Sequence, residues 1–366
     1  MKKALLVLLV AVVAFAAFAG GAQETASASS AEPKVVIITD ATGVDDKSFN
    51  AAAWRGILQF YNDGGKGQGS LYSNIKCQSS DDYLPNLKNA AAQGFDLIIT
   101  TGFTFGDAVA EFSAQYPNQK IIIVDVDYLP QTENLIQYIY EEEQGSYLVG
   151  VVAAEQAKAE GIKNPKFGFI GGVPGATITK FEVGYIEGIL SVLPDAEIVD
   201  YYANDWGAPQ LAKTVAKQWY DSGVYCIFTA AGGTGSGAID QAKEYRAAGK
   251  NVWVIGVDSD QYEDGIYAEG KSAVLTSMLK VVENSTIDAL TKVKNNTFKG
   301  GVITQNMKTD GVGFSVANAD LAADAKTSAE AAKKDILDGK MVVDKTYKQL
   351  AAKFTRFAGK LSAIDD

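Results

Sequence analysis

A short polar segment, GVDDKSFNAAAWRG (residues 43–56), contains side chains well suited to bind a small molecule. Asp45 and Asp46 are adjacent carboxylates that accept hydrogen bonds, and Trp54 offers a flat face for stacking. A solvated helix start explains the acids but not the indole. Trp206, in the loop sequence NDWGAP, also closely follows a predicted strand. Core or surface packing is the ordinary use of tryptophan, but two indoles facing each other across a cleft would hold a planar ring between them.

Other side chains capable of binding follow predicted strands in both halves of the chain. Open α/β sheets bind ligands beyond the carboxyl ends of their strands, so these positions are candidates for one shared site. In the first half they include Thr101, Gly102 and Asp125, and in the second half Gly232, Gly233 and Asp258.

The glycine-rich segment AAGGTGSGA (residues 230–238) has three interpretations. It satisfies G-x-G-x-x-G/A after a predicted strand, and Asp258 follows it at the spacing of a dinucleotide-binding fingerprint. It is also suited to a strand end where a ligand approaches the backbone closely, or to a tight strand–helix turn. Its place in the second half of the chain, and the lack of a catalytic acid–base set, argue against a dinucleotide enzyme.

The elements that must position these residues form two similar sets. Short β-branched runs alternate with helical patterns from Lys34 to about Ser277, which predicts parallel sheets covered on both faces. We therefore expect two doubly wound, Rossmann-like α/β lobes in tandem, with a cleft between facing strand ends. The predicted strands cover residues 34–40, 74–80, 96–102, 120–126 and 135–141, then 166–172, 197–203, 224–231, 252–258 and 272–278.

The amino-acid composition argues against several classes of catalytic and binding site. Histidine is absent, so there is no Ser-His-Asp triad, no Cys-His pair and no HExxH zinc site. The net charge of −11 argues against nucleic acid as a partner. Cys77 and Cys226 are expected to be buried thiols, with a disulfide left open. The acidic segment DSDQYEDG lacks the order of a calcium loop, and we expect neither a metal nor a cofactor.

The N-terminal residues have the pattern of an export signal. Lys2 and Lys3 precede an apolar run, and Ala17-Phe18-Ala19 has the small-x-small form of a cleavage site, which predicts a signal peptide over residues 1–19. Residues 20–33 have the composition of a disordered tether. No cysteine lies near the cleavage site, which argues against lipid anchoring. We expect a free periplasmic protein.

Several motifs, in order, resemble one family over about residues 34–345. They are GVDDKSFNAAAWRG, TTGF, IIIVDVD, EEEQGSYLVGVVAA, FEVGYIEG, AAGGTGSG, GVDSDQ and LTSMLK. Together they are similar to the basic membrane protein family of ABC-transporter receptors, in particular its purine nucleoside receptors. The resemblance implies a type I periplasmic-binding-protein fold, with two lobes joined by three crossovers. It places lobe 1 at 34–140 plus about 272–308, and lobe 2 at 141–271 plus about 309–366.

The resemblance also implies roles for individual residues. Trp54 and Trp206 would stack on opposite faces of the base, and Asp125 would accept hydrogen bonds from the base edge. The sugar would be held by Asp45, Asp46, Asp258 and Lys280, with Lys280 balancing the charge of Asp45 and Asp258, and Gly232 or Gly233 would offer a backbone contact. The loop near Trp206 departs from the family, because Ala208 stands where an aspartate is frequent.

The function implied is that of a monomeric receptor, not an enzyme. It would capture adenosine, guanosine or inosine and deliver it to an inner-membrane ABC permease. The many carboxylates favour nucleosides over phosphorylated nucleotides. Alternatives are a receptor for a sugar or another small polar ligand, a sensing module for a membrane kinase, and a dinucleotide-binding enzyme.

Overall fold

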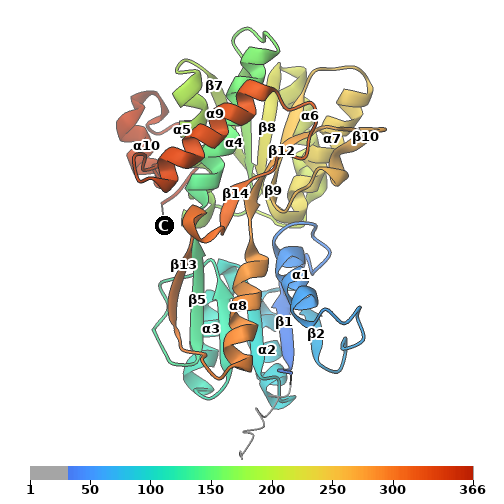
Figure 1. Cartoon of the computed structure of the whole chain (residues 1–366), viewed down its shortest axis with the longest axis vertical. Helices are drawn as coiled ribbons and strands as arrows, with labels where there is room; N and C mark the ends of the chain where they lie inside the picture. The colour runs from blue at the N-terminus through green and yellow to red at the C-terminus, as the bar shows by residue number, and fades with distance from the viewer. Residues whose placement is uncertain (1–31, 366) are drawn as a thin grey trace, which may run out of the picture. The chain divides into compact units, whose positions relative to one another are not determined.

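The computed structural model describes residues 32–365. The predicted signal peptide (1–19) and almost all of the predicted tether (20–33) therefore lie outside the described residues. Two six-stranded sheets, each with helices on both faces, form two lobes (Figure 1). This confirms the predicted pair of doubly wound α/β lobes.

The first sheet is entirely parallel and has the order β13-β5-β4-β3-β1-β2. Its apolar strands are buried on both faces, as expected for β-branched runs in a parallel sheet. The strands are β1 (Val35–Thr39), β2 (Tyr72–Lys76), β3 (Leu97–Thr101), β4 (Lys120–Val124), β5 (Leu135–Tyr140) and β13 (Gly301–Gln305).

Alternate residues of this sheet pack on different helices. Val35 and Ile37 lie in the core beneath α1 and α8, whereas Val36 and Ile38 pack against α2 and α3 on the other face. The four helices are α1 (Phe49–Tyr61), α2 (Tyr83–Ala92), α3 (Gly106–Gln115) and α8 (Val282–Lys294).

The second sheet has the order β14-β12-β9-β8-β6-β7, and only β14 is antiparallel to its neighbour. The strands are β6 (Lys166–Gly171), β7 (Glu197–Tyr202), β8 (Val224–Ala230), β9 (Trp253–Asp258), β12 (Val274–Lys280) and β14 (Val312–Phe314). A separate small hairpin is formed by β10 (Ile266–Ala268) and β11 (Lys271–Ser272).

Helices α6 and α7 cover one face of the second sheet, and α4, α5 and α9 lie together on the other side (Figure 1). The short α10 packs near α5. Their bounds are α4 (Glu142–Ala159), α5 (Ala176–Val192), α6 (Pro209–Asp221), α7 (Ser236–Ala247), α9 (Ala323–Leu337) and α10 (Tyr347–Lys353).

The chain passes between the lobes three times: from β5 to α4, from β12 to α8, and from β13 to β14. One boundary differs from the sequence-based expectation. Strand β12 lies in the segment expected in lobe 1 from about residue 272, but it pairs with β9 in the second sheet. The crossover therefore follows Lys280, because β12 completes the parallel order of lobe 2 before the chain enters α8.

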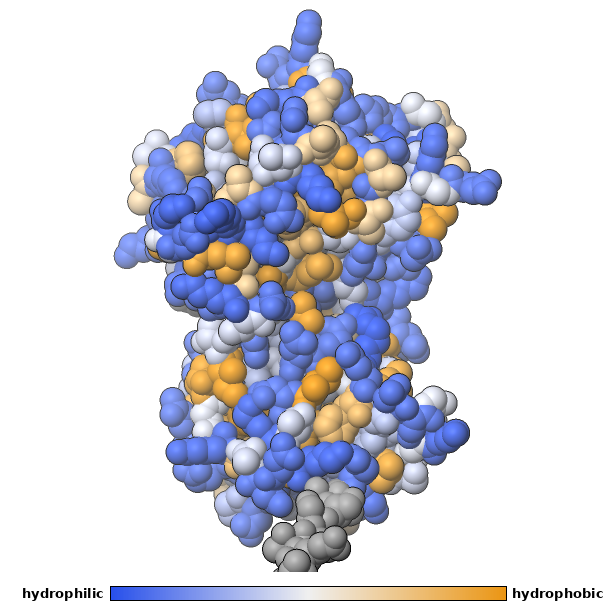
Figure 2. Space-filling view, viewed as in Figure 1, coloured by the Kyte–Doolittle hydropathy of each residue, from blue (hydrophilic) through white to orange (hydrophobic). Residues whose placement is uncertain are grey.

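Buried apolar residues lie between sheets and helices, and the face in Figure 2 is mostly hydrophilic with scattered apolar patches. Cys77 and Cys226 are both buried and free, one in each lobe. No helix within residues 32–365 is both long and apolar enough to cross a membrane.

Candidate ligand-binding site between the lobes

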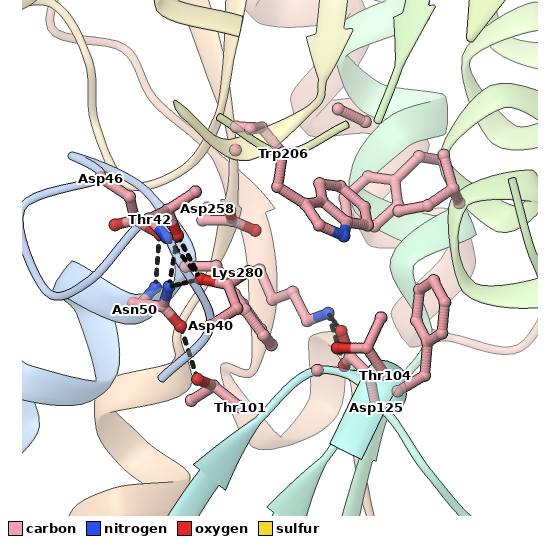
Figure 3. A pocket seen from close by; sticks show the side chains of 18 residues that line it. Asp40, Thr42, Asp46, Asn50, Thr101, Thr104, Asp125, Trp206, Asp258 and Lys280 are labelled. Carbon is pink, nitrogen blue, oxygen red and sulfur yellow. Dashed lines mark hydrogen bonds and ion pairs between the residues drawn. The ribbon is translucent and has the colours of Figure 1, made fainter. Parts of the chain in front are cut away.

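A pocket lies where the carboxyl ends of the two sheets face each other (Figure 3). In each sheet the second strand lies on one side of the first strand and the third strand lies on the other side, so the direction of strand addition changes between β1 and β3 and between β6 and β8. Open α/β sheets bind ligands at this point. The pocket contains about 600 Å³ of space, part of it open to solvent. It is lined by Asp40, Thr42, Asp46, Phe49, Asn50, Thr101, Gly102, Phe103, Thr104, Asp125, Ile178, Phe181, Trp206, Ala230, Gly232, Val257, Asp258 and Lys280.

Lobe 1 contributes a hydrogen-bonded polar wall. The Asn50 amide donates to Asp40 Oδ1 at 3.1 Å and to Thr42 Oγ1 at 2.8 Å, and its own oxygen accepts from the Thr101 hydroxyl. Thr42 also donates from its backbone nitrogen to Asp40 Oδ1, at 3.0 Å. These side chains hold one another in place (Figure 3). All three of their hydrogen bonds to Asp40 end on Oδ1, so within residues 32–365 the second carboxylate oxygen has no side-chain partner and remains an acceptor.

Asp46 lines the pocket but acts mainly on its own helix. Its carboxylate accepts from the backbone nitrogens of Ser48 at 3.0 Å, Asn50 at 2.9 Å and Ala51 at 2.9 Å, which satisfies free donors at the start of α1. Burial raises the pKa of Asp46, and these three bonds partly offset that effect. The neighbouring Asp45 is exposed and lines an adjoining groove instead, so the structure does not bring it into the pocket.

Trp54 does not line the pocket, and the prediction that it faces Trp206 across the cleft is wrong. Its ring meets Tyr72 edge-on, with centroids 5.8 Å apart, and packs on the core of lobe 1. Phe49 is the aromatic residue that α1 presents to the pocket. The two positions are five residues apart, which at about 100° per residue places them about 140° apart around the helix.

A buried cation stands at the junction of the lobes. Lys280 Nζ lies 2.6 Å from both oxygens of Asp125 and 2.9 Å from Glu142, and all three side chains are almost fully buried. Burial alone would lower the pKa of Lys280, but the carboxylates of Asp125, Glu142 and Asp258 outweigh it and raise that pKa. The expected charge partners of Lys280 were Asp45 and Asp258, but its ion pairs in the structure are with Asp125 and Glu142.

Asp258 is a pocket carboxylate whose titration is strongly perturbed. Burial raises its pKa to about 7, although Lys280 and a hydrogen bond from the Ser48 hydroxyl oppose the shift. Asp125 and Asp258 both have left-handed backbone, with φ of 71° and 63°. Aspartate and asparagine tolerate this conformation better than most residues, which explains why such side chains can occupy these strand ends.

Aromatic side chains supply the apolar surface of the pocket. Phe49 and Phe103 come from lobe 1, and Phe181 and Trp206 from lobe 2. Phe103 meets the half-buried Trp206 edge-on across the cleft, with centroids 6.1 Å apart. The indole nitrogen of Trp206 points into the pocket (Figure 3) and has no hydrogen-bond partner among the described residues.

The sequence therefore predicted part of the site. The structure brings together eight of its predicted residues: Asp46, Thr101, Gly102, Asp125, Trp206, Gly232, Asp258 and Lys280. It leaves out Trp54, and it places Asp45 and Gly233 in the adjoining groove.

Only some of the pocket residues that were not predicted carry a signal in the sequence that could have identified them. Phe49 and Asn50 stand in the same polar segment as the predicted acids, and Phe103 directly follows Gly102, so strand-end position is a usable signal for them. Phe181 lies inside α5 and carries no such signal. Within residues 32–365, no group of three or more His, Cys, Asp or Glu side chains is arranged to hold a metal ion.

Residues 33–346 match the family described as "ABC transporter substrate-binding protein PnrA-like". The chain is 38% identical over 324 residues to a Listeria innocua protein named "CD4+ T-cell-stimulating antigen", covering 86% of this chain and 89% of that relative. It is 35% identical over 331 residues to the "ABC transporter nucleoside-binding protein BmpA" of Lactococcus lactis, covering 88% and 92% of the two chains. A solute-binding protein of an Aeropyrum pernix ABC transporter system has the same fold, with a TM-score of 0.77 and 23% identity over 89% of this chain and 98% of that one.

Proposed function

Because the chain belongs to the PnrA-like family of ABC transporter substrate-binding proteins, we propose that it captures a purine nucleoside between its lobes and delivers it to a permease. Family membership makes it a receptor rather than an enzyme. The name of the Lactococcus lactis relative describes that protein as nucleoside-binding, and it supports the same class of ligand here.

The observation that carries the proposal is the composition of the pocket. Four aromatic side chains surround a space whose polar groups are chiefly acceptors, including one oxygen each of Asp40 and Asp258 that has no hydrogen-bond donor in the described part of the chain. A purine ring gains from contact with aromatic side chains, and ribose hydroxyls donate well to carboxylates. Trp206 adds a single N–H donor for an acceptor atom of the ring or sugar.

The charges of the pocket favour a ligand without a phosphate group. Among the described residues Lys280 is the only Lys or Arg that lines the pocket, and its charge is already balanced by Asp125 and Glu142. A phosphate placed there would meet Asp40, Asp46 and Asp258 without a free cation to pair with. The receptor should therefore prefer nucleosides to nucleotides.

We further propose that the receptor works in the periplasm as a free monomer. The predicted signal peptide, with Ala17-Phe18-Ala19 as its cleavage site, supports export. The mature protein should begin near Gly20, carry no lipid and partition into the soluble periplasmic fraction. N-terminal sequencing of the exported protein tests this, and a protein that retains Met1 or enters a detergent phase would contradict it.

The ligand is tested by native purification and titration. Mass spectrometry of small molecules released from the purified protein should find a purine nucleoside. Titration calorimetry should then show binding of guanosine, adenosine or inosine, with much weaker binding of GMP, free ribose and NAD. Tight binding of a sugar, or of NAD, with no response to any nucleoside would overturn the proposal, as would turnover of the nucleoside to free base.

A further inference from the structure

A buried threonine makes three hydrogen bonds to the loop that carries Trp206. Thr234 donates its backbone N–H to the carbonyl oxygen of Trp206 at 2.8 Å. Its hydroxyl donates to the carbonyl oxygen of Asp205 at 2.7 Å and accepts from the backbone nitrogen of Ala208 at 2.8 Å. Thr234 therefore binds the chain before, at and after Trp206, although its own side chain is not part of the pocket lining.

The glycines on either side of Thr234 allow the Trp206 loop to pack closely against the glycine-rich turn. A β-carbon on Gly237 would lie 1.8 Å from the carbonyl oxygen of Pro209, at the start of α6, and one on Gly233 would lie 3.1 Å from the carbonyl oxygen of Trp206. Both distances are shorter than ordinary contacts of a β-carbon. The glycine-rich turn, which includes the short helix η3 (Gly232–Gly235), is thus packed against the Trp206 loop at close range.

The indole itself rests on a further glycine. A β-carbon on Gly172, just after β6, would lie 2.1 Å from Cζ3 and 2.3 Å from Cε3 of Trp206. The six-membered part of the indole therefore packs directly on backbone. The five-membered part, with its N–H, is left pointing into the pocket (Figure 3).

We propose that the glycine-rich turn of residues 232–237 orients Trp206, and that Thr234 is a positioning residue for ligand binding. On this account the glycines of the motif serve close packing of one loop on another, and not the binding of a pyrophosphate. The positioning itself is independent of the ligand, whereas its effect on affinity rests on the proposed nucleoside-binding function.

The orientation of Trp206 can be measured without any ligand. The protein, labelled with 5-fluorotryptophan, gives ¹⁹F resonances from its four tryptophans, and Trp206→Phe identifies the one from Trp206. Thr234→Val keeps the shape of the side chain but removes both hydroxyl hydrogen bonds. We expect it to shift or broaden the Trp206 resonance alone, and Thr234→Ser to restore it.

Thr276→Val is the matched control. Thr276 is also buried in lobe 2 and donates to a backbone carbonyl, that of Ser315, at 2.7 Å, but it lies on β12, away from Trp206. It should leave the Trp206 resonance unchanged. An unaltered Trp206 resonance in Thr234→Val, or an equal change in Thr276→Val, would overturn the proposal.

Binding of guanosine then measures the consequence. Thr234→Val should weaken binding about 3- to 30-fold, a smaller loss than removal of the Trp206 side chain itself, because the indole is no longer held in one orientation; Thr234→Ser should recover most of that loss. In a Trp206→Ala background, Thr234→Val should cause no further loss, because the residue that it positions is gone. An equal loss in both backgrounds would show that Thr234 acts on binding by another route.

The two proposals can fail separately. If the unaltered protein binds no nucleoside, the proposed ligand is wrong, while the ¹⁹F spectra still decide whether Thr234 orients Trp206. Gly172→Ala gives a second perturbation: if folded, it should displace the Trp206 resonance more than Thr234→Val does, because the added methyl group overlaps the indole ring.

Discussion

The two walls of the pocket differ in how completely they are hydrogen-bonded. In lobe 1, Asp40, Asn50 and Thr101 bond to one another, so their geometry is set within one lobe. In lobe 2, the Trp206 N–H has no partner among the described residues, and Asp258 receives its hydrogen bond from Ser48 of the other lobe. Lobe 1 thus holds its polar groups within the lobe, whereas lobe 2, although it packs Trp206 closely, relies on Ser48 across the cleft for the hydrogen bond to Asp258. This division predicts which substitutions affect folding, affinity or closure.

The largest loss of stability and affinity should come from substitution of Lys280, because its ion pairs connect the two lobes. Lys280→Met removes the direct ion-pair partner of the buried Asp125, which then has only the more distant charge of Lys180, and leaves Glu142 paired with Lys180 alone among the described residues. Removing one partner of a buried ion pair costs about 3–5 kcal/mol of unfolding free energy. Urea denaturation should show that loss, and calorimetry should show guanosine affinity reduced about 100-fold or more.

Lys180→Met is the control for this substitution. Lys180 contacts Glu142 at 3.1 Å from α5, but it does not line the pocket. It should lower stability while changing affinity far less than Lys280→Met. If both variants lost affinity equally, the role of Lys280 would be one of folding only.

The next largest effect should distinguish the aromatic residues. Loss of one stacking side chain costs about 1–3 kcal/mol, so Phe49→Ala and Trp206→Ala should each weaken guanosine binding about 5- to 150-fold. Trp54→Phe keeps the contact with Tyr72 and should leave affinity within about twofold of the unaltered protein. If Trp54→Phe strongly weakened guanosine binding and Phe49→Ala did not, Trp54 and not Phe49 would be the residue that stacks on the base.

The titration of Asp258 should make affinity and stability respond to pH in opposite directions. Its pKa is about 7 in the folded protein and 3.8 in an unperturbed aspartate. As pH rises from about 4 to about 7, the unfolded chain loses this proton first, so the unfolding free energy contributed by Asp258 falls. Guanosine affinity should rise over the upper part of this range, because the ionised carboxylate is the better acceptor.

Asp258→Asn isolates this group and suits the left-handed backbone at position 258. The guanosine affinity of this variant should no longer change between about pH 5.5 and 8, and it should equal the affinity that the unaltered protein has at low pH. The stability profile should keep a slope, because burial also raises the pKa of Glu143 and of Glu182 to about 8. An affinity profile unchanged by Asp258→Asn would show that another group controls it.

The smallest effect should come from an ion pair between the lobes outside the pocket. Lys47 Nζ lies 2.7 Å from Asp264, and the Lys47 side chain is 63% exposed. Exposed pairs contribute about 0.2–1 kcal/mol, so Lys47→Ala should weaken binding by at most about fivefold. The loss should be equal for adenosine and guanosine, since this pair biases closure without touching the ligand.

Lys88→Ala removes an exposed pair within lobe 1, between Lys88 and Glu111, and should leave affinity unchanged. A Lys47→Ala effect that differed between the two nucleosides would mean that this pair acts on the pocket itself.

The sequence predicts the fold better than the details of the site, for physical reasons. Apolar runs and the polar residues that end them reveal the strands, and strand ends meet at one edge, so Thr101, Asp125 and Asp258 could be found. Whether Phe49 or Trp54 faces the pocket depends on where α1 begins, which a short apolar segment does not fix. The pairing of Lys280 with Glu142 joins two crossovers far apart in the sequence, and only the packed structure brings them together.

The three crossovers also have a consequence for how the protein folds. The first sheet lacks its edge strand β13, and α1 lacks its neighbour α8, until five of the six strands of the second sheet have been synthesised. Contacts between such distant segments slow folding, because long loops must close before they form. Neither lobe can reach its final structure while the C-terminal third of the chain is missing. Late closure of both sheets would suit the export that we propose above, because an export channel admits a chain whose sheets have not yet formed.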